Sequence, residues 1–153
     1  MVSFSRHVFY KGDSTMIFTS YFGNMKNIRQ KNPDIVFISI AGKTPDWVIG
    51  QENCFQMKEF APKYNWWKEW HEKFKDRYES EESKRWYEKR YFDTILSNLN
   101  LNDVMKSLKA FSDGKDVCFL CYETPEKFCH RHLMSKWLTD AGVNCEEMSN
   151  KRS

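Results

Sequence analysis

The stretch from position 118 to 132 holds the densest set of reactive side chains in the sequence, Cys-Phe-Leu-Cys-Tyr-Glu-Thr-Pro-Glu-Lys-Phe-Cys-His-Arg-His. A thiolate is a strong nucleophile, and a carboxylate or imidazole beside it can move a proton. Side chains alternate along a strand, so Cys118 points away from Cys121 and is interpreted as a core residue. The pattern predicts a catalytic site whose candidate residues are Cys121, Glu123, Cys129 and His130.

Arg131 adds a cation to this set. The residues from Thr124 onward resemble a helix start, and a helix N-terminus binds anions and lowers the pKa of a nearby thiol. A guanidinium can hold a phosphate or carboxylate with two hydrogen bonds. We therefore expect Arg131 to bind an anionic group of a ligand. In the alternative, an ion pair with Glu123 or Glu126 makes Arg131 a structural clamp.

Known motifs narrow the chemistry. The sequence contains neither a P-loop nor the phosphatase pattern of Cys, five residues and Arg. A zinc site built from Cys121, Cys129 and His130, with or without Cys54, is an alternative, but its spacing matches no standard structural zinc pattern. We therefore predict no cofactor and keep zinc as the alternative.

The cysteine count indicates a compartment. Five cysteines occur, and the N-terminus has no apolar leader. An odd number without an export signal is typical of a reducing environment, so we expect free cysteines and a cytoplasmic location. Cys54 and Cys145 are interpreted as structural.

The apolar pattern predicts the elements that must position these residues. Strands are expected at residues 16–22, 35–41 and 116–122, with a weaker one at 143–148. The second and third are almost continuously apolar, which is typical of parallel strands buried on both faces. This predicts a single-domain, Rossmann-like three-layer α/β fold with a short, mostly parallel sheet.

Helices are expected in a long insertion between the second and third strands, and again after the third. Trp66, Trp70 and Phe74 recur at four-residue spacing and predict one buried helical stripe. Gly142 is expected to end the last helix. N-terminal caps are predicted at Asn65, Ser80, Asn100 and Thr124, the last with Pro125 at the first helical position.

Residues 42–64 show no clean period and are expected to form a long loop, which in a compact domain is often functional. This loop leaves the carboxyl edge of the predicted sheet, where ligands bind in open α/β folds. The loop after Ser20 and Tyr21 leaves the same edge. We therefore expect Lys43, Ser20 and Tyr21 to join Arg131 in binding the anion.

The length of the chain indicates one domain, and its net charge limits the kinds of binding partner. The 153 residues suit one domain, with residues 1–14 and 150–153 expected as flexible or peripheral ends. A formal net charge of +3 is too small to indicate a broad nucleic-acid or anionic-membrane surface. No apolar stretch approaches the roughly 18 residues of a membrane span, so no membrane partner is expected. Any recognition of an anion must be local.

Aromatic residues make up 16% of the chain, and many alternate with Lys and Arg between positions 58 and 91. A helical core stripe with a solvated charged face explains most of this pattern. Trp67 and Trp86 fall beside that stripe. Their exposure would favour a stacking platform for unpaired bases or a partner surface.

The motif Cys121-Tyr122-Glu123, a short loop, then Cys129-His130-Arg131 and an apolar helix resembles the domain of unknown function 488 family. The likeness covers about residues 15–142 and includes Ile17–Phe22 and Ile38–Lys43. It implies a small bacterial or phage-type α/β protein whose recurring polar positions correspond to Cys121, Glu123, Cys129, His130 and Arg131. It supplies no activity, because the family is named for lacking one.

Two functions follow from these observations. The first is an enzyme that acts on a phosphate-containing ligand, such as a nucleotide or nucleic acid, at the carboxyl edge of the sheet. The second is a non-catalytic binding module whose aromatic helices contact a protein or single-stranded nucleic acid. Fast, selective alkylation of Cys121 or Cys129 would favour the enzyme.

Overall fold

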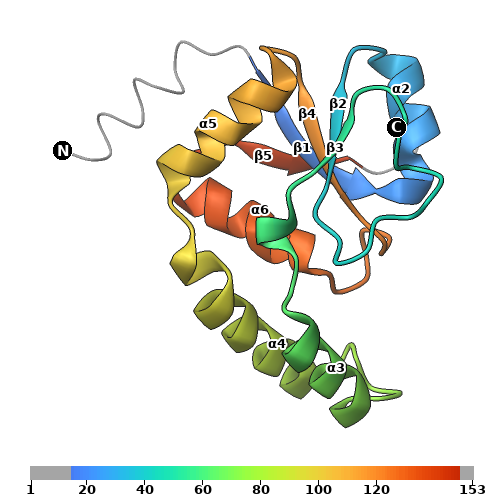
Figure 1. Cartoon of the computed structure of the whole chain (residues 1–153). Helices are drawn as coiled ribbons and strands as arrows, with labels where there is room; N and C mark the ends of the chain where they lie inside the picture. Colours follow the sequence, from blue (N-terminus) through green and yellow to red (C-terminus); the bar gives the residue numbers. More distant parts are fainter. Residues whose placement is uncertain (1–14, 149–153) are drawn as a thin grey trace.

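The computed structural model describes residues 15–148 and holds a five-stranded sheet between helices (Figure 1). Every strand pairing is parallel, and the strand order is β3-β2-β4-β1-β5. The strands are β1 (Ile17–Tyr21), β2 (Val36–Ser39), β3 (Cys54–Gln56), β4 (Val117–Cys121) and β5 (Cys145–Glu147). The predicted three-layer α/β fold is confirmed. The predicted ends, residues 1–14 and 150–153, lie outside the described residues.

Helices cover both faces of this sheet. One apolar cluster joins α2 to one face, and a larger cluster joins α5, α6 and the α3–α4 pair to the other. None of the helices within residues 15–148 is long and apolar enough to cross a bilayer. The helices are α2 (Met25–Lys31), α3 (Tyr64–Lys73), α4 (Glu81–Thr94), α5 (Leu101–Ser112) and α6 (His130–Asp140), with short 3-10 turns η1 (Phe22–Asn24), η2 (Lys58–Phe60) and η3 (Leu96–Asn98).

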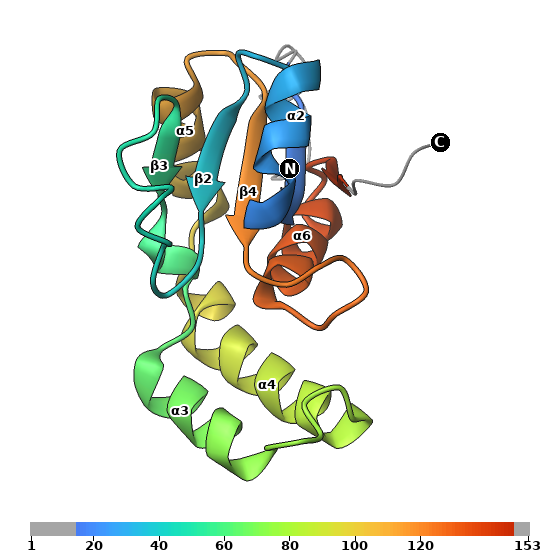
Figure 2. The same ribbon diagram turned by 90° about the vertical axis from the view of Figure 1, so that its right-hand side faces the viewer.

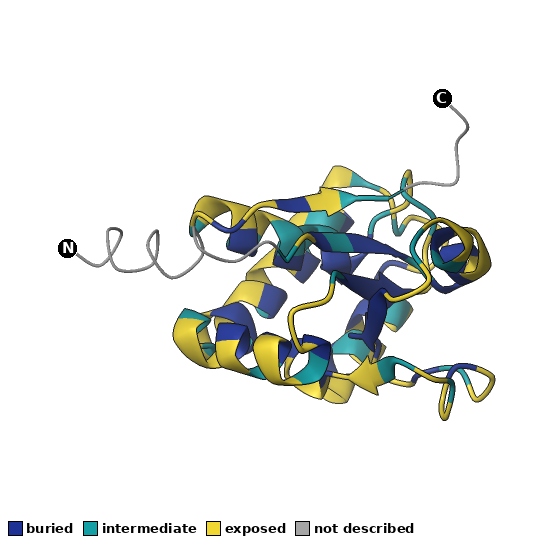
Figure 3. Cartoon of the chain, turned by 90° about the horizontal axis from the view of Figure 1, so that it is seen from above, coloured by how far each residue is buried: buried dark blue, intermediate teal, exposed yellow. Residues whose placement is uncertain are grey.

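The two central strands, β2 and β4, are buried along their whole length, as their continuous apolar runs predict (Figure 3). Their side chains alternate between the two clusters. Cys118 and Leu120 pack with α2, whereas Phe119 and Cys121 face α6. The prediction that Cys118 and Cys121 point to opposite faces is therefore confirmed.

The expectation of a long loop over residues 42–64 is wrong. This stretch contains β3, which pairs with β2, and the η2 turn that precedes α3. β3 lies at the edge of the sheet, with Phe55 and Gln56 exposed. A strand of three residues is too short to show a hydrophobic period in the sequence. The insertion of helices thus lies between β3 and β4. Helix α2, between β1 and β2, was not predicted either.

Two of the four predicted helix caps are confirmed. The side chains of Ser80 and Asn100 accept hydrogen bonds from the backbone three residues later, at the starts of α4 and α5. The prediction for Asn65 is wrong, because the cap position is two residues earlier, at Lys63, and α3 begins at Tyr64. The glycine stop is confirmed, since Gly142 follows α6 with φ +94°.

The predicted start of the last helix at Thr124 is also wrong, and α6 begins at His130. The Thr124 hydroxyl bonds to the Glu126 carboxylate at 2.7 Å instead of capping a helix. Lys127 closes a turn onto the Thr124 carbonyl at 3.0 Å. Cys129 is therefore the extended cap residue of α6, with φ −155°.

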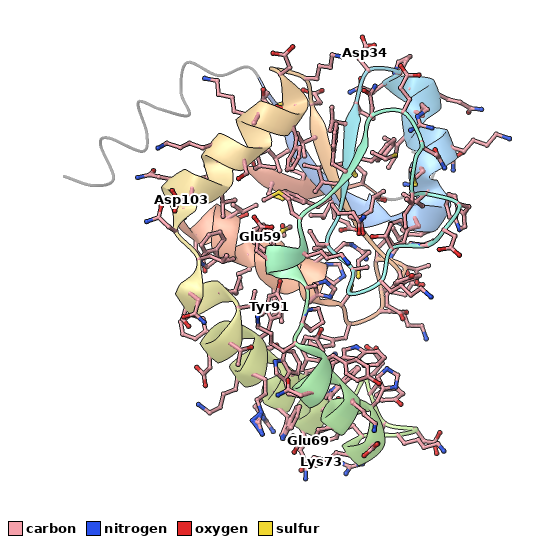
Figure 4. The ribbon with its side chains drawn as sticks, in the orientation of Figure 1. Asp34, Glu59, Glu69, Lys73, Tyr91 and Asp103 are labelled. Carbon is pink, nitrogen blue, oxygen red and sulfur yellow. The ribbon has the colours of Figure 1, made fainter. Side chains whose placement is uncertain are left out.

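Helices α3 and α4 form a pair that projects from the carboxyl edge of the sheet (Figure 2). Trp66, Trp70 and Phe74 are buried on the inner side of the pair, which confirms the predicted stripe. Glu69 and Lys73 point outward from α3, and Tyr91 points from α4 toward the rest of the molecule (Figure 4). The Tyr91 hydroxyl donates a buried 2.6 Å hydrogen bond to the Phe60 carbonyl.

Replacing Tyr91 by Phe should lower the free energy of unfolding by about 1.5 kcal/mol, because the buried Phe60 carbonyl loses its donor. Urea denaturation of the purified protein measures this change. Tyr64→Phe is the matched control, since Tyr64 is exposed, and it should stay within about 0.5 kcal/mol of the wild type. Equal stabilities of the two variants would contradict the role given to the Tyr91 bond.

Candidate functional site

A cavity of about 800 Å³ opens at the carboxyl edge of the sheet. One wall is made by the residues that follow β2 and β4, and the other by the η2 turn and α3. Cys121, Cys129 and His130 line it, although each is at least nine-tenths buried. A concave site of this size, with a few convergent polar groups, is typical of small-molecule binding sites.

The two thiols and the imidazole meet within this cavity. Cys121 ends β4, and Cys129 and His130 begin α6, so the β4–α6 connection brings all three together. Their ligand atoms lie within 4.8 Å of one another. Cys121 Sγ lies 3.7 Å from Nδ1 of His130. Three of the four predicted catalytic residues are therefore neighbours in space.

The thiols differ in acidity. The pKa of Cys129 lies well below its usual value, chiefly because Cys121 donates a hydrogen bond to it, with further help from His130 and Arg131. The pKa of Cys121 is raised well above its usual value, first by the same hydrogen bond to Cys129 and then by burial. The two thiols titrate as a pair, and the lowered pKa makes Cys129 the member that ionises first.

The orientation of His130 follows from a second bond. Its Nε2 lies 2.7 Å from the carbonyl oxygen of Ile40, just after β2. A carbonyl can only accept, so Nε2 carries a proton and Nδ1, which is 3.7 Å from Cys121 Sγ, is left without one. Nδ1 can then take a proton from a thiol or serve as a metal ligand, and a carbonyl on the opposite nitrogen is the usual support for a metal-bound histidine.

Glu123 and Lys43 also line the cavity, as the sequence predicts. Both are exposed at its mouth. The Tyr122 hydroxyl donates a hydrogen bond to the Lys43 carbonyl and ties the loop after β4 to the loop after β2. The carboxylate and the ammonium therefore stand at the rim, and the thiols lie below them.

Arg131 lies outside the cavity lining. Its guanidinium is fully buried and forms a bidentate ion pair with Glu147 of β5, at 3.1 Å from Nε and 2.9 Å from Nη2. Its Nη1 is buried without a hydrogen-bond partner among residues 15–148. Arg131 is thus clamped by Glu147, neither of the two carboxylates considered from the sequence, and its binding of an external anion stays a prediction.

Ser20 and Tyr21 are likewise absent from the cavity lining. Ser20 is buried, donates to the Met148 carbonyl at 2.6 Å and accepts from Asn24 at 3.1 Å. Tyr21 ends β1 opposite Cys121 in the strand register. Their predicted contact with an anion stays a prediction.

The sequence interpretation missed most of the opposite wall. Lys58, Lys63, Tyr64 and His71 line the cavity from the η2 turn and α3, together with the partly buried Trp67. The signal that could have found them was the position of Trp67 beside the buried stripe, with Tyr64 three residues before it on the same side of the helix. Trp86 instead packs against the Trp66 and Phe74 rings.

Replacing Glu147 by Ala should destabilise the protein by about 3 kcal/mol, because the buried Arg131 guanidinium loses its counterion. Thermal or urea unfolding measures the loss. Glu146→Ala on the same strand is the matched control, since Glu146 is exposed, and it should change stability by less than about 0.5 kcal/mol. A Glu147→Ala protein as stable as the Glu146→Ala protein would refute the clamp.

The family of the chain follows from a comparison with known proteins. The family model described as "Active DUF488-N3 subclade" matches residues 22–142 and so includes Cys121, Glu123, Cys129, His130 and Arg131. No match was found among curated proteins or among solved structures. Because the family model matches well over half of the chain, and the motif residues lie together at one end of its sheet, this chain belongs to the DUF488 family.

Proposed function

We propose that this chain is an enzyme that acts on a phosphate-containing ligand, such as a nucleotide or nucleic acid, through the Cys129 thiolate. The observation that carries the proposal is the Cys121–Cys129 pair beside His130 at an 800 Å³ cavity. A thiol kept only for packing gains nothing from a neighbour that holds it ionised. A thiolate that faces a cavity is a nucleophile.

The remaining groups fit supporting roles. Nδ1 of His130 accepts a proton and returns it, and Glu123 is a second acid or base at the rim. The charge of Arg131 favours the thiolate from outside the cavity. Three lysines that line the cavity, Lys43, Lys58 and Lys63, are the candidate partners of a phosphate group.

Alkylation by iodoacetamide tests the thiolate. Because the pKa of Cys129 lies well below the ordinary thiol value, its alkylation rate should rise less steeply from pH 7 to pH 9 than that of an ordinary thiol. Peptide mapping by mass spectrometry follows each cysteine separately. Cys54 is the internal control, since burial raises its pKa and its rate should climb with pH.

The Cys121→Ala variant tests whether Cys121 lowers the pKa of Cys129. Loss of the hydrogen bond from Cys121 raises the pKa of Cys129, so its alkylation rate at pH 7 should fall about tenfold and should then rise with pH. Cys145→Ala removes a buried thiol outside the cavity and should leave the Cys129 profile unchanged. A wild-type Cys129 rate that rises about tenfold per pH unit from 7 to 9 would refute the nucleophile assignment.

A zinc site is the second candidate. Two thiols and one imidazole form a Cys₂His ligand set, and the Ile40 carbonyl leaves Nδ1 of His130 available for a metal. Three protein ligands and one open position facing a cavity are typical of catalytic zinc. In this case the metal takes up both sulfur atoms, and neither thiol is the nucleophile.

Elemental analysis after zinc loading and gel filtration distinguishes the two candidates. The zinc site predicts one metal ion per chain, lost in Cys129→Ser and retained in Cys54→Ser, whose sulfur lies outside the cluster. Bound zinc should also protect both Cys121 and Cys129 from alkylation. Less than one tenth of an equivalent of zinc, with alkylation unaffected by added zinc, excludes this candidate.

The non-catalytic alternative rests on the exposed rings of Tyr64 and Tyr122 at the cavity. In that function the Cys121–His130 cluster only braces the fold, and the α3–α4 pair contacts a protein or single-stranded nucleic acid. Slow, pH-dependent alkylation of Cys129 in a protein that contains no zinc favours this module over the enzyme.

A further inference from the structure

Helix α3 presents a row of rings to the cavity. Tyr64, Trp67 and His71 follow each other at three- and four-residue spacing, so they share one side of the helix. The Tyr64 and Trp67 rings lie 6.2 Å apart between centroids with an interplanar angle of 26°, and the Trp67 and His71 centroids lie 4.0 Å apart. The cavity therefore has one wall built mainly of flat rings.

Tyr64 contributes little to the core, whereas Trp67 is partly buried against it. Tyr64 is 71% exposed, the largest exposed fraction among the large hydrophobic residues described. Trp66, the next residue after Asn65, is buried and supplies the packing between α3 and α4 instead. An exposed ring beside a cavity is a stacking surface for another flat ring, and every nucleobase has two such faces.

Positive charge lies next to these rings. Lys63 immediately precedes Tyr64, Lys58 lies in the preceding turn, and Lys43 faces them from the other wall. None of the three forms an ion pair within residues 15–148, so each keeps its charge for a ligand. Glu123 is the acidic residue in the lining. The rim thus favours an anionic group within reach of the ring wall.

We propose that this wall is a nucleotide subsite, in which the base stacks on Tyr64 and Trp67 and the phosphate pairs with Lys58 and Lys63. The inference rests on the proposed function and deepens it, because it names the part of the ligand that the protein recognises. The cavity volume of about 800 Å³ lies within the range of about 300–1,000 Å³ found for small-molecule sites. A free nucleotide and one nucleotide of a single strand share this chemistry.

Equilibrium binding to the full chain tests the subsite, with tryptophan fluorescence or calorimetry as the readout. The probes are AMP, ribose 5-phosphate, which lacks the base, and a ten-residue oligoadenylate. AMP should bind about tenfold more tightly than ribose 5-phosphate, because only AMP can stack. Oligoadenylate that binds more tightly than AMP identifies a single strand as the source, and the reverse order identifies a free nucleotide.

Matched variants locate the contact. Tyr64→Ala should weaken AMP binding by about fivefold or more, whereas Phe92→Ala, which removes an exposed ring of α4 outside the cavity, should not. Lys63→Gln should weaken both AMP and ribose 5-phosphate, whereas Lys89→Gln, in an exposed ion pair with Asp93, should weaken neither.

The inference is overturned if AMP and oligoadenylate bind no more tightly than ribose 5-phosphate, or if Tyr64→Ala binds AMP as the wild type does. Its failure is distinguishable from that of the proposed function, because the alkylation profile of Cys129 is measured without any nucleotide. If Cys129 alkylation depends only weakly on pH but AMP binds no more tightly than ribose 5-phosphate, only the nucleotide subsite is refuted. If AMP binds more tightly than ribose 5-phosphate but Cys129 alkylates as an ordinary thiol, the nucleophile assignment is refuted and the subsite is supported.

Discussion

The hydrogen bond between His130 and the Ile40 carbonyl fixes the orientation of the imidazole on which the site depends. It joins the first residue of α6 to the chain just after β2, across the end of β4. The buried carbonyl would lose its partner if the imidazole turned, so the ring is fixed in both position and tautomer. Nδ1 is then the unprotonated nitrogen, and it lies 3.7 Å from Cys121 Sγ. Proton transfer and metal binding both require this orientation.

The start of α6 is held from its other side by Arg131. Successive helix residues point about 100° apart, so His130 faces the cavity and Arg131 faces β5. The ion pair with Glu147, which also accepts a 2.6 Å bond from Thr19, fixes α6 to the edge of the sheet. Because the guanidinium charge also favours the Cys129 thiolate, the clamp contributes to the chemistry of the thiol pair.

The sequence was sufficient for the parts of the site that are close along the chain. Cys121, Cys129 and His130 belong to one strand–helix connection, so their proximity follows from local structure alone. The Glu147 partner of Arg131 lies 16 residues later in β5, and an ion pair between a helix and a strand leaves no local pattern. The helix start expected at Thr124 fails for a local reason. The Thr124 hydroxyl bonds to the Glu126 carboxylate, two residues away, instead of capping a helix.

The cavity wall formed by the η2 turn and α3 was also not predictable from the sequence, because it depends on contacts between distant segments. Tyr64 and Lys63 line the same cavity as the thiols because α4, paired with α3, packs against α6, a tertiary contact that depends on buried Trp and Tyr rings. Aromatic and basic residues alternate through this stretch, and periodicity assigns them to core or solvent. Periodicity cannot identify the few that border a cavity, such as Trp67.

Electrostatics then separates the two negative charges that the proposed reaction brings together. A thiolate and a phosphate 4 Å apart repel by about 4 kcal/mol near a protein surface, so the phosphate gains nothing by approaching Cys129 directly. Arg131 does not offset this repulsion within the cavity, because it lies outside the cavity lining and is paired with Glu147. Lys43, Lys58 and Lys63 are exposed at the rim. In the proposed function the phosphate therefore lies at the rim, and the uncharged part of the ligand faces Cys129.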